Sequence, residues 1–169
     1  MKLPPSDSQL GILMARLPRH GRVEWIGLRP RRDVSMTAVG EVIAVAGKGL
    51  IGDRYAGGSG KRGLTLLQAE HLPVIAALSG HAALAASLLR RNVVVSGLAV
   101  IALKGRRFRI GEVLLEGTDS CDPCSRMEDA LGPGGYNAMR GHGGLCARIV
   151  EGGRFQLGDA LVPLEDEIA

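Results

Sequence analysis

The hydrophobic positions of this chain fall into many short runs separated by glycine, proline and polar residues. Runs of apolar and β-branched residues with this spacing predict strands. Glycines at Gly111, Gly153 and Gly158 stand where hairpin turns require positive φ. The predicted strands cover residues 23–28, 37–46, 92–95, 107–110, 113–116, 145–150 and 160–163.

Helical spacing is confined to the middle of the chain. Residues 68–78 and 81–89 show it, with Ser79-Gly80 as the break, and a short helix is predicted at 125–131. Pro73 weakens the first of these helices. Strands and helices do not alternate, so the pattern favours a mainly β fold, a closed β-barrel with a few helical insertions, over a doubly wound α/β sheet.

Length and composition are those of one domain. The 169 residues are 46% hydrophobic, enough to build a core without disulfides or structural metals. We predict the domain at residues 21–166, preceded by a poorly ordered or loosely docked N-terminal arm at 1–20, which contains three prolines. The apolar stretch at 10–15 is too short for a signal-peptide core, and no run is long enough to span a membrane.

The charge pattern indicates an anionic ligand. The net charge of +4 comes mainly from clustered arginines, whereas aromatic residues make up 3% of the chain. A reader of single-stranded nucleic acid needs aromatic stacking platforms, so a phosphate-bearing small molecule is the better partner. Three cysteines, an odd number, argue against a disulfide scaffold and predict a reducing, cytoplasmic location.

A glycine-rich loop at 47–63 is long enough to be functional. It contains Gly47-x-Gly49-x-x-Gly52, and Glu70 stands at the distance expected in a dinucleotide-binding fingerprint. That fingerprint requires the third glycine to open a helix, and here Asp53-Arg54-Tyr55 and more glycines follow it. The loop is therefore either a plain turn or an anion-binding loop that uses Arg54, Lys61 and Arg62.

Cys121-Asp122-Pro123-Cys124 has three interpretations. With His142 and Cys146 the two cysteines have spacings that a structural zinc site could use. They could also form a redox dithiol, although no βαβ context surrounds them. In the third interpretation Cys124 acts alone as a thiolate at the start of the predicted helix 125–131, a soft ligand for molybdenum or a carrier of transferable sulfur.

Taken in order, several segments resemble the MOSC family, named for the C-terminal domain of molybdenum-cofactor sulfurase, and in particular its stand-alone bacterial members. The resemblance runs from about residue 21 to 166, with one departure at Tyr55, where the family commonly has histidine. The segments that carry it are Gly47 to Tyr55, Lys61-Arg62 with Leu64-Thr65-Leu66, Leu89 to Gly97, Phe108-x-Ile110-Gly111, Pro123-Cys124, Gly143-Gly144 with Ala147-Arg148, and Gly158-Asp159.

The resemblance implies a barrel related to the pyruvate-kinase barrel domain, with a pocket for a molybdopterin-type molybdenum cofactor. Cys124 matches the cysteine that ligates the metal in cofactor-binding relatives. Arg90 and Asn92 match an Arg-x-Asn motif that contacts the cofactor, and Thr65 falls in a segment that lines the pocket. The cofactor-binding residues expected in this chain are Arg54, Lys61, Arg62, Thr65, Arg90, Asn92 and Arg148.

By this resemblance the leading function is an oxidoreductase that reduces N-hydroxylated small molecules, such as hydroxylamino-purines or amidoximes. The chain lacks flavin motifs and iron–sulfur spacing, so electrons are expected from a separate donor of the flavodoxin or flavin-reductase type. The alternative is a sulfur carrier with a persulfide on Cys124. A third hypothesis is a non-catalytic module that binds an anion; neither nucleic acid nor a membrane is an expected partner.

Overall fold

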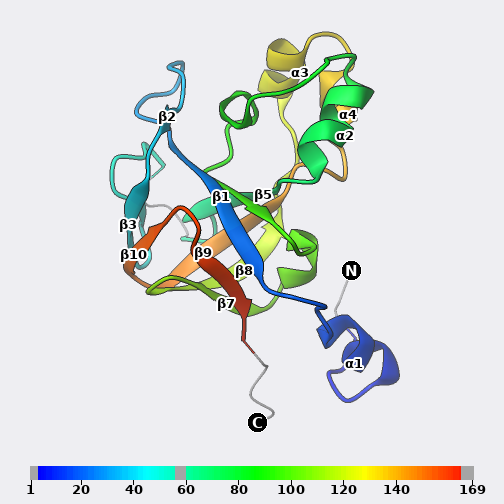
Figure 1. Cartoon of the computed structure of the whole chain (residues 1–169), viewed down its shortest axis with the longest axis vertical. Helices are drawn as coiled ribbons and strands as arrows, with labels where there is room; N and C mark the ends of the chain where they lie inside the picture. Colours follow the sequence, from blue (N-terminus) through cyan, green and yellow to red (C-terminus); the bar gives the residue numbers. More distant parts are fainter. Residues whose placement is uncertain (1–3, 56–59, 165–169) are drawn as a thin grey trace.

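The computed structural model describes residues 4–55 and 60–164, and a closed ring of seven strands dominates this part of the chain (Figure 1). Pairing between Gly21 and Leu161 closes the ring, and only the pair β5–β6 is parallel. This confirms the predicted mainly β closed barrel with helical insertions. In order around the barrel the strands are β1 (Gly21–Leu28), β11 (Ala160–Pro163), β7 (Arg107–Ile110), β8 (Val113–Ser120), β9 (Leu145–Glu151), β5 (Leu64–Gln68) and β6 (Val93–Ser96).

A smaller sheet lies beside the ring. It contains β10 (Gly153–Gln156), β3 (Glu41–Val45) and β4 (Gly49–Leu50), while β2 (Thr37–Ala38) extends β1. The single strand predicted at 37–46 is wrong, because the chain changes partner there, from β1 to β10. The loop predicted at 47–63 contains β4, and its residues 56–59 lie outside the described part.

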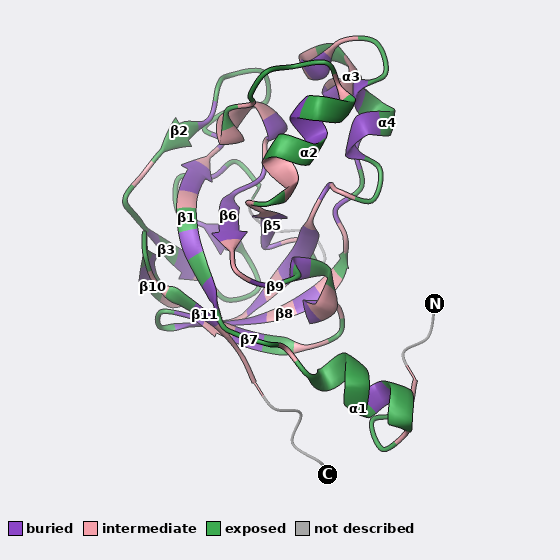
Figure 2. Ribbon diagram, turned by 45° about the vertical axis from the view of Figure 1, so that its right-hand side comes forward, coloured by how far each residue is buried: buried purple, intermediate pink, exposed green. Residues whose placement is uncertain are grey.

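Two hydrophobic clusters share the strands β5 and β6. Leu66 and Val93 point into the barrel core, whereas their neighbours Leu67 and Val94 pack against the helices outside it. Figure 2 shows these strands buried between the barrel interior and the helices. Burial on both faces explains why their sequences are continuously apolar and do not alternate, and why β5 was missed as a strand.

The helices form a lobe over that outer face (Figure 1). The predicted helix at 125–131 is confirmed, but the one at 68–78 begins only at His71, because Gln68 pairs in β5, and 81–89 is helical only at its end. A further short 3₁₀ helix, η2 (Val100–Leu103), lies elsewhere on the barrel. The lobe comprises α2 (His71–Leu78), η1 (Ala86–Leu89), α3 (Ser125–Leu131) and α4 (Gly135–Met139).

The N-terminal arm contains a helix that the sequence did not predict, α1 (Gln9–Ala15). Ser8 caps it by accepting a hydrogen bond from the Gly11 backbone N–H at 3.0 Å. In Figure 1 it lies at the end of the molecule away from the helical lobe. Loose docking of the arm stays a prediction. Within the described residues, no helix has the length and apolar character needed to cross a membrane.

Candidate functional site

A buried polar network lies where β1, β5 and β6 meet the loop after β4. Asp53 accepts three hydrogen bonds from Arg29, from the backbone N–H at 2.6 Å, Nε at 3.1 Å and Nη2 at 2.8 Å. The same guanidinium donates to Asn92 Oδ1 at 3.0 Å, and Thr65 Oγ1 donates to that oxygen at 3.1 Å. A closed set of partners of this kind orders the three segments that meet here.

Asn92 and Thr65 are thus placed beneath the surface and not on it. Both are 0% exposed. The Asn92 amide nitrogen donates to the Gly27 carbonyl at 3.1 Å, and its backbone N–H donates to Thr65 Oγ1 at 3.0 Å. Either side chain could contact a bound molecule only if the hydrogen bonds of the network broke. In this structure the two residues therefore hold the surrounding segments in place and do not face a ligand.

Tyr55, the departure from the family pattern, connects two parts of the site. Its ring is in cation–π contact with two guanidinium groups, with Arg29 Cζ 5.7 Å and Arg62 Cζ 5.6 Å from the ring centroid. Its backbone N–H donates to Asp53 at 3.2 Å. An aromatic ring can stack with two cations in this way, which a histidine does less well when it is protonated.

Cys124 is exposed, whereas Cys121 and Cys146 are buried. It is the N-cap residue of α3 and follows the buried Pro123. The loop before it is held from below by Arg91, whose Nε donates to the Gly143 carbonyl at 2.7 Å and whose Nη2 donates to the Cys121 carbonyl at 2.8 Å. Arg91 is 4% exposed, so this attachment is an internal part of the fold.

A group of arginines surrounds the N-terminal end of α3. Arg126 Nη1 and Arg90 Nη2 both donate to the Arg32 carbonyl, at 3.0 and 3.1 Å. Arg90 has a left-handed backbone, φ 55°, which directs its side chain there. Burial, then the positive charges of Arg126, Arg29 and Arg54, lower the pKa of Arg90. Asp33, whose Oδ1 lies 3.4 Å from Arg126 Nη2, offsets part of this repulsion. The remaining excess of positive charge makes the arginine group a candidate anion site.

The other predicted cations line a cavity of about 460 Å³ beside strands β8 and β9. Lys61, Arg62 and Arg148 face it together with Cys146 and the acidic residues Glu116 and Asp119. Arg148 lies 4.0 Å from Glu116, and Lys104 pairs with Asp119 at 2.6 Å. The predicted set of cofactor-binding residues is therefore divided between this cavity, the arginine group at α3 and the buried network.

The zinc arrangement predicted for Cys121, Cys124, His142 and Cys146 does not form. Within residues 4–55 and 60–164 no three His, Cys, Asp or Glu side chains are grouped closely enough to hold a metal ion. Cys121 and Cys146 do come together, because β8 and β9 are paired, while Cys124 stands apart on the surface.

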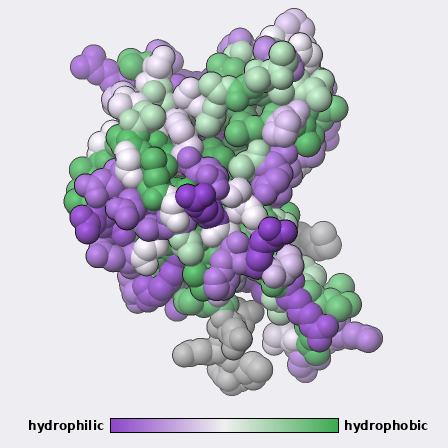
Figure 3. Space-filling model, viewed as in Figure 1, coloured by the Kyte–Doolittle hydropathy of each residue, from purple (hydrophilic) through white to green (hydrophobic). Residues whose placement is uncertain are grey.

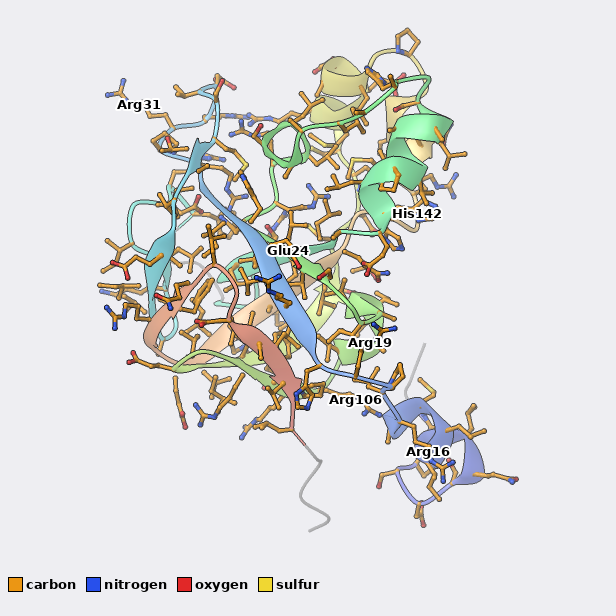
Figure 4. The ribbon with its side chains drawn as sticks, viewed as in Figure 1. Arg16, Arg19, Glu24, Arg31, Arg106 and His142 are labelled. Atoms are coloured by element: carbon orange, nitrogen blue, oxygen red, sulfur yellow. The ribbon has the colours of Figure 1, made fainter. Side chains whose placement is uncertain are left out.

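Two arginine-rich surfaces lie at opposite ends of the molecule. Figure 4 shows Arg31 on the loop near β2, at the end that carries the helical lobe, whereas Arg16, Arg19 and Arg106 lie at the α1 end. Hydrophobic side chains gather over the helical lobe in the space-filling view (Figure 3). Only the first of these surfaces is on the same side as Cys124.

Sequence analysis missed three residues of the site. Arg29, Arg91 and Arg126 were noted only as charges, or not at all. Arg126 could have been found by its position two residues after Cys124, and Arg91 by its place beside Asn92. Nothing local indicates that Arg29 is buried, because its partner Asp53 is distant in the sequence.

The comparisons with known proteins agree with this architecture. The MOSC domain model matches residues 53–162, and the chain belongs to the MOSC family. Among solved structures, YuaD from Bacillus subtilis matches with a TM-score of 0.77 and 18% identity, covering 89% of this chain and 99% of its own.

YiiM from Geobacillus stearothermophilus matches with a TM-score of 0.72 and 19% identity, covering 88% of this chain and 77% of its own. YiiM from Escherichia coli matches with a TM-score of 0.65 and 20% identity, covering 86% of this chain and 70% of its own. At such identities the likeness shows the shared fold. No curated protein matches the sequence.

Proposed function

We propose that this MOSC protein binds a molybdopterin-type molybdenum cofactor through Cys124 and reduces N-hydroxylated small molecules. The observation that carries the proposal is the exposed Cys124 thiol beside the arginine group that contains Arg54, Arg90 and Arg126. A soft sulfur donor suits molybdenum, and guanidinium groups suit the cofactor's phosphate. The donor set therefore fits the cofactor at both of its ends.

The chain's own residues have distinct parts in this proposal. Cys124 would hold the metal, and Arg54, Arg90 and Arg126 would hold the phosphate. Asn92 and Thr65 act from beneath: with Asp53 they fix Arg29, and Arg29 in turn stacks on Tyr55. Arg91 keeps the loop before Cys124 in place through the Cys121 carbonyl. Lys61, Arg62 and Arg148 line the neighbouring cavity, a candidate place for part of a ligand.

The bound cofactor would supply the two-electron chemistry. The overall conversion takes a hydroxylamine, two electrons and two protons to an amine and water. Because the chain offers no flavin or iron–sulfur motif, the electrons would come from a separate donor of the flavodoxin or flavin-reductase type. The exposure of Cys124 leaves this side of the protein open to a small substrate.

A sulfur carrier is the second candidate, and one observation favours it. A persulfide must reach a partner's acceptor site, and Cys124 is the exposed member of the three free cysteines, on the protruding helical lobe. The arginine group would then stabilise the negative persulfide and dock an acidic partner. The two candidates differ in what Cys124 carries.

The test is to express the full chain in a host that makes molybdenum cofactor and to measure bound metal, pterin and cyanide-labile sulfur. Near-stoichiometric molybdenum and pterin, both lost in Cys124→Ser and retained in the neighbouring exposed Ser125→Ala control, would support the reductase. Reduction of a hydroxylamino-purine with a chemical electron donor would then be measured.

Other outcomes separate the alternatives. Metal-free protein with cyanide-labile sulfur that Cys124→Ser abolishes would support the carrier. Anion binding that Cys124→Ser leaves intact, in a protein that carries neither molybdenum nor cyanide-labile sulfur, would contradict both thiol-based functions and leave a non-catalytic binding module.

A further inference from the structure

Cys121 and Cys146 lie next to each other on one face of the barrel wall. Cys146 pairs with Asp119 across the β8–β9 ladder, and the Cys121 N–H donates to the Gly144 carbonyl at 2.9 Å. Alternate residues of a strand share a face, so the two cysteines are diagonal neighbours. Leu145 and Ala147, on either side of Cys146, point into the barrel core. The cysteine pair therefore faces outward, although Cys121 is 2% and Cys146 7% exposed.

Arg62 covers this pair. Its Nη2 donates to Cys121 Sγ at 3.4 Å, and its Nε is buried without a hydrogen-bond partner in the described part of the chain. Arg62 and Cys146 both line the 460 Å³ cavity, so Cys121 lies one side chain behind the cavity wall. Arg62 thus donates one N–H to a sulfur, and its buried Nε–H keeps an unused hydrogen-bonding capacity beside the pair.

The environment divides the protons unequally between the two sulfurs. Hydrogen bonding from the Cys146 thiol, opposed by burial and assisted by the charges of Arg91 and Arg62, lowers the pKa of Cys121 to about 6. The same hydrogen bond and burial raise the pKa of Cys146. At neutral pH the pair is one thiolate beside one thiol, which is the combination of a nucleophile and a proton donor.

We propose that Cys121 and Cys146 form a second sulfur site, separate from Cys124, that reduces small hydroperoxides and closes to a disulfide. The Cys121 sulfur forms a bond to the terminal peroxide oxygen as the O–O bond breaks. The leaving oxygen takes the Cys146 proton and departs as water or an alcohol. The Cys146 thiolate then attacks the sulfur of the Cys121 sulfenic acid, and the hydroxyl leaves as hydroxide, which a proton from the solvent converts to water. An external thiol reduces the disulfide and completes the cycle.

The site selects small peroxides by its construction. Cys146 lines a cavity whose other walls are mostly polar or charged, including Lys61 and Arg148, and Cys121 lies behind that wall. The free Arg62 N–H can stabilise the negative charge that develops on the departing oxygen. Cys124 is not part of this cycle, because it stands apart on the exposed surface, whereas Cys121 and Cys146 are buried neighbours across the β8–β9 ladder. This activity is independent of the cofactor proposed above.

The experiment uses the reduced full-length protein and hydrogen peroxide, followed by peptide mapping without reductant. Trypsin leaves Cys121 and Cys124 on one peptide and Cys146 on another, so the Cys124→Ser variant identifies the partner. We expect a link between Cys121 and Cys146 in both proteins, reversed by dithiothreitol. In Cys146→Ser the reaction should stop at a Cys121 sulfenic acid that dimedone traps.

The Arg62→Gln variant tests whether Arg62 activates Cys121 by lowering the pKa of its thiol. Each unit by which the pKa of Cys121 rises reduces the thiolate fraction about tenfold at pH 5, and the oxidation rate should fall accordingly. Arg109→Gln, an exposed arginine on β7, is the matched control and should leave the rate unchanged. A Cys121–Cys124 link, faster oxidation of Cys124, or intact Cys121 and Cys146 in peroxide-treated wild-type protein would overturn the proposal. The wild-type map needs no variant, so a misfolded mutant cannot hide the result.

Discussion

Asp53 holds Arg29 through both carboxylate oxygens in the interior of the site, with Nη2 to Oδ2 at 2.8 Å and side-chain exposures of 9% for arginine and 1% for aspartate. Buried pairs of this kind are costly to break, because the remaining charge has no water to solvate it. The pair joins the loop after β4 to the end of β1 and, through Asn92, to β6. The pair therefore fixes the relative positions of β1, β6 and the loop after β4, which carry the candidate site.

Asp53→Asn should destabilise the protein by about 3–5 kcal/mol, because it leaves the Arg29 charge buried and uncompensated. Urea denaturation followed by circular dichroism measures the effect. Glu41→Gln breaks the exposed Arg154–Glu41 pair and should cost at most about 1 kcal/mol. Equal losses of unfolding free energy in the two variants would show that the buried Asp53–Arg29 pair stabilises the protein no more than an exposed pair does.

Arg126→Gln should weaken anion binding beside Cys124, because it removes one of the guanidinium groups that meet at the Arg32 carbonyl. Pyrophosphate titration by calorimetry should show a loss of about 1.5–3 kcal/mol in binding free energy, the range for a hydrogen bond to a charged group. Arg106→Gln, at the far end of the molecule, is the control (Figure 4). An identical pyrophosphate affinity in Arg126→Gln and wild type would remove Arg126 from the site.

Gly144 is required both by backbone conformation and by space. Its φ is 94°, and a Cβ there would collide with the Leu66 carbonyl. Gly141, with φ 78°, has open space around it. Gly141→Ala should cost about 1–2 kcal/mol from the left-handed backbone alone, and Gly144→Ala should cost clearly more. Thermal unfolding of both variants measures the difference, and similar losses would mean that the clash is relieved by a small shift.

His71 and His142 give the fold a pH-dependent element. Their rings meet edge to face with centroids 4.8 Å apart, and each Nδ1 is buried without a partner in the described residues. Burial first, and then the charge of His142, lower the pKa of His71. The unfolded chain therefore binds this proton at a higher pH than the native protein does.

Stability contributed by neutral His71 is complete above its unfolded pKa of about 6.5 and is lost as the pH falls through the lower native pKa. His71→Gln should therefore flatten the fall in the urea midpoint between pH 7 and pH 5. His81→Gln, on an exposed histidine, should keep the wild-type slope. A wild-type slope in His71→Gln would contradict this assignment.

The class of fold could be predicted from the sequence, which also singled out Cys124 as the candidate reactive residue. Strand runs, glycine turns and ordered motifs indicate a barrel of the MOSC type, because alternation and turn chemistry are local properties that survive in one dimension. Cys124 at the start of α3 was predicted from the same local signals, and its exposure is consistent with them. The role of Cys124 stays a prediction.

Which charged and sulfur-bearing residues come into contact depends on how the strands pair in the folded protein. Thr65 and Asn92 became buried supports because β5 and β6 pair in parallel, and Arg29 found Asp53 across the barrel end. Cys121 and Cys146 became neighbours because β8 and β9 pair in one register. Such contacts depend on pairing between segments far apart in the chain, and no local pattern encodes the register of that pairing.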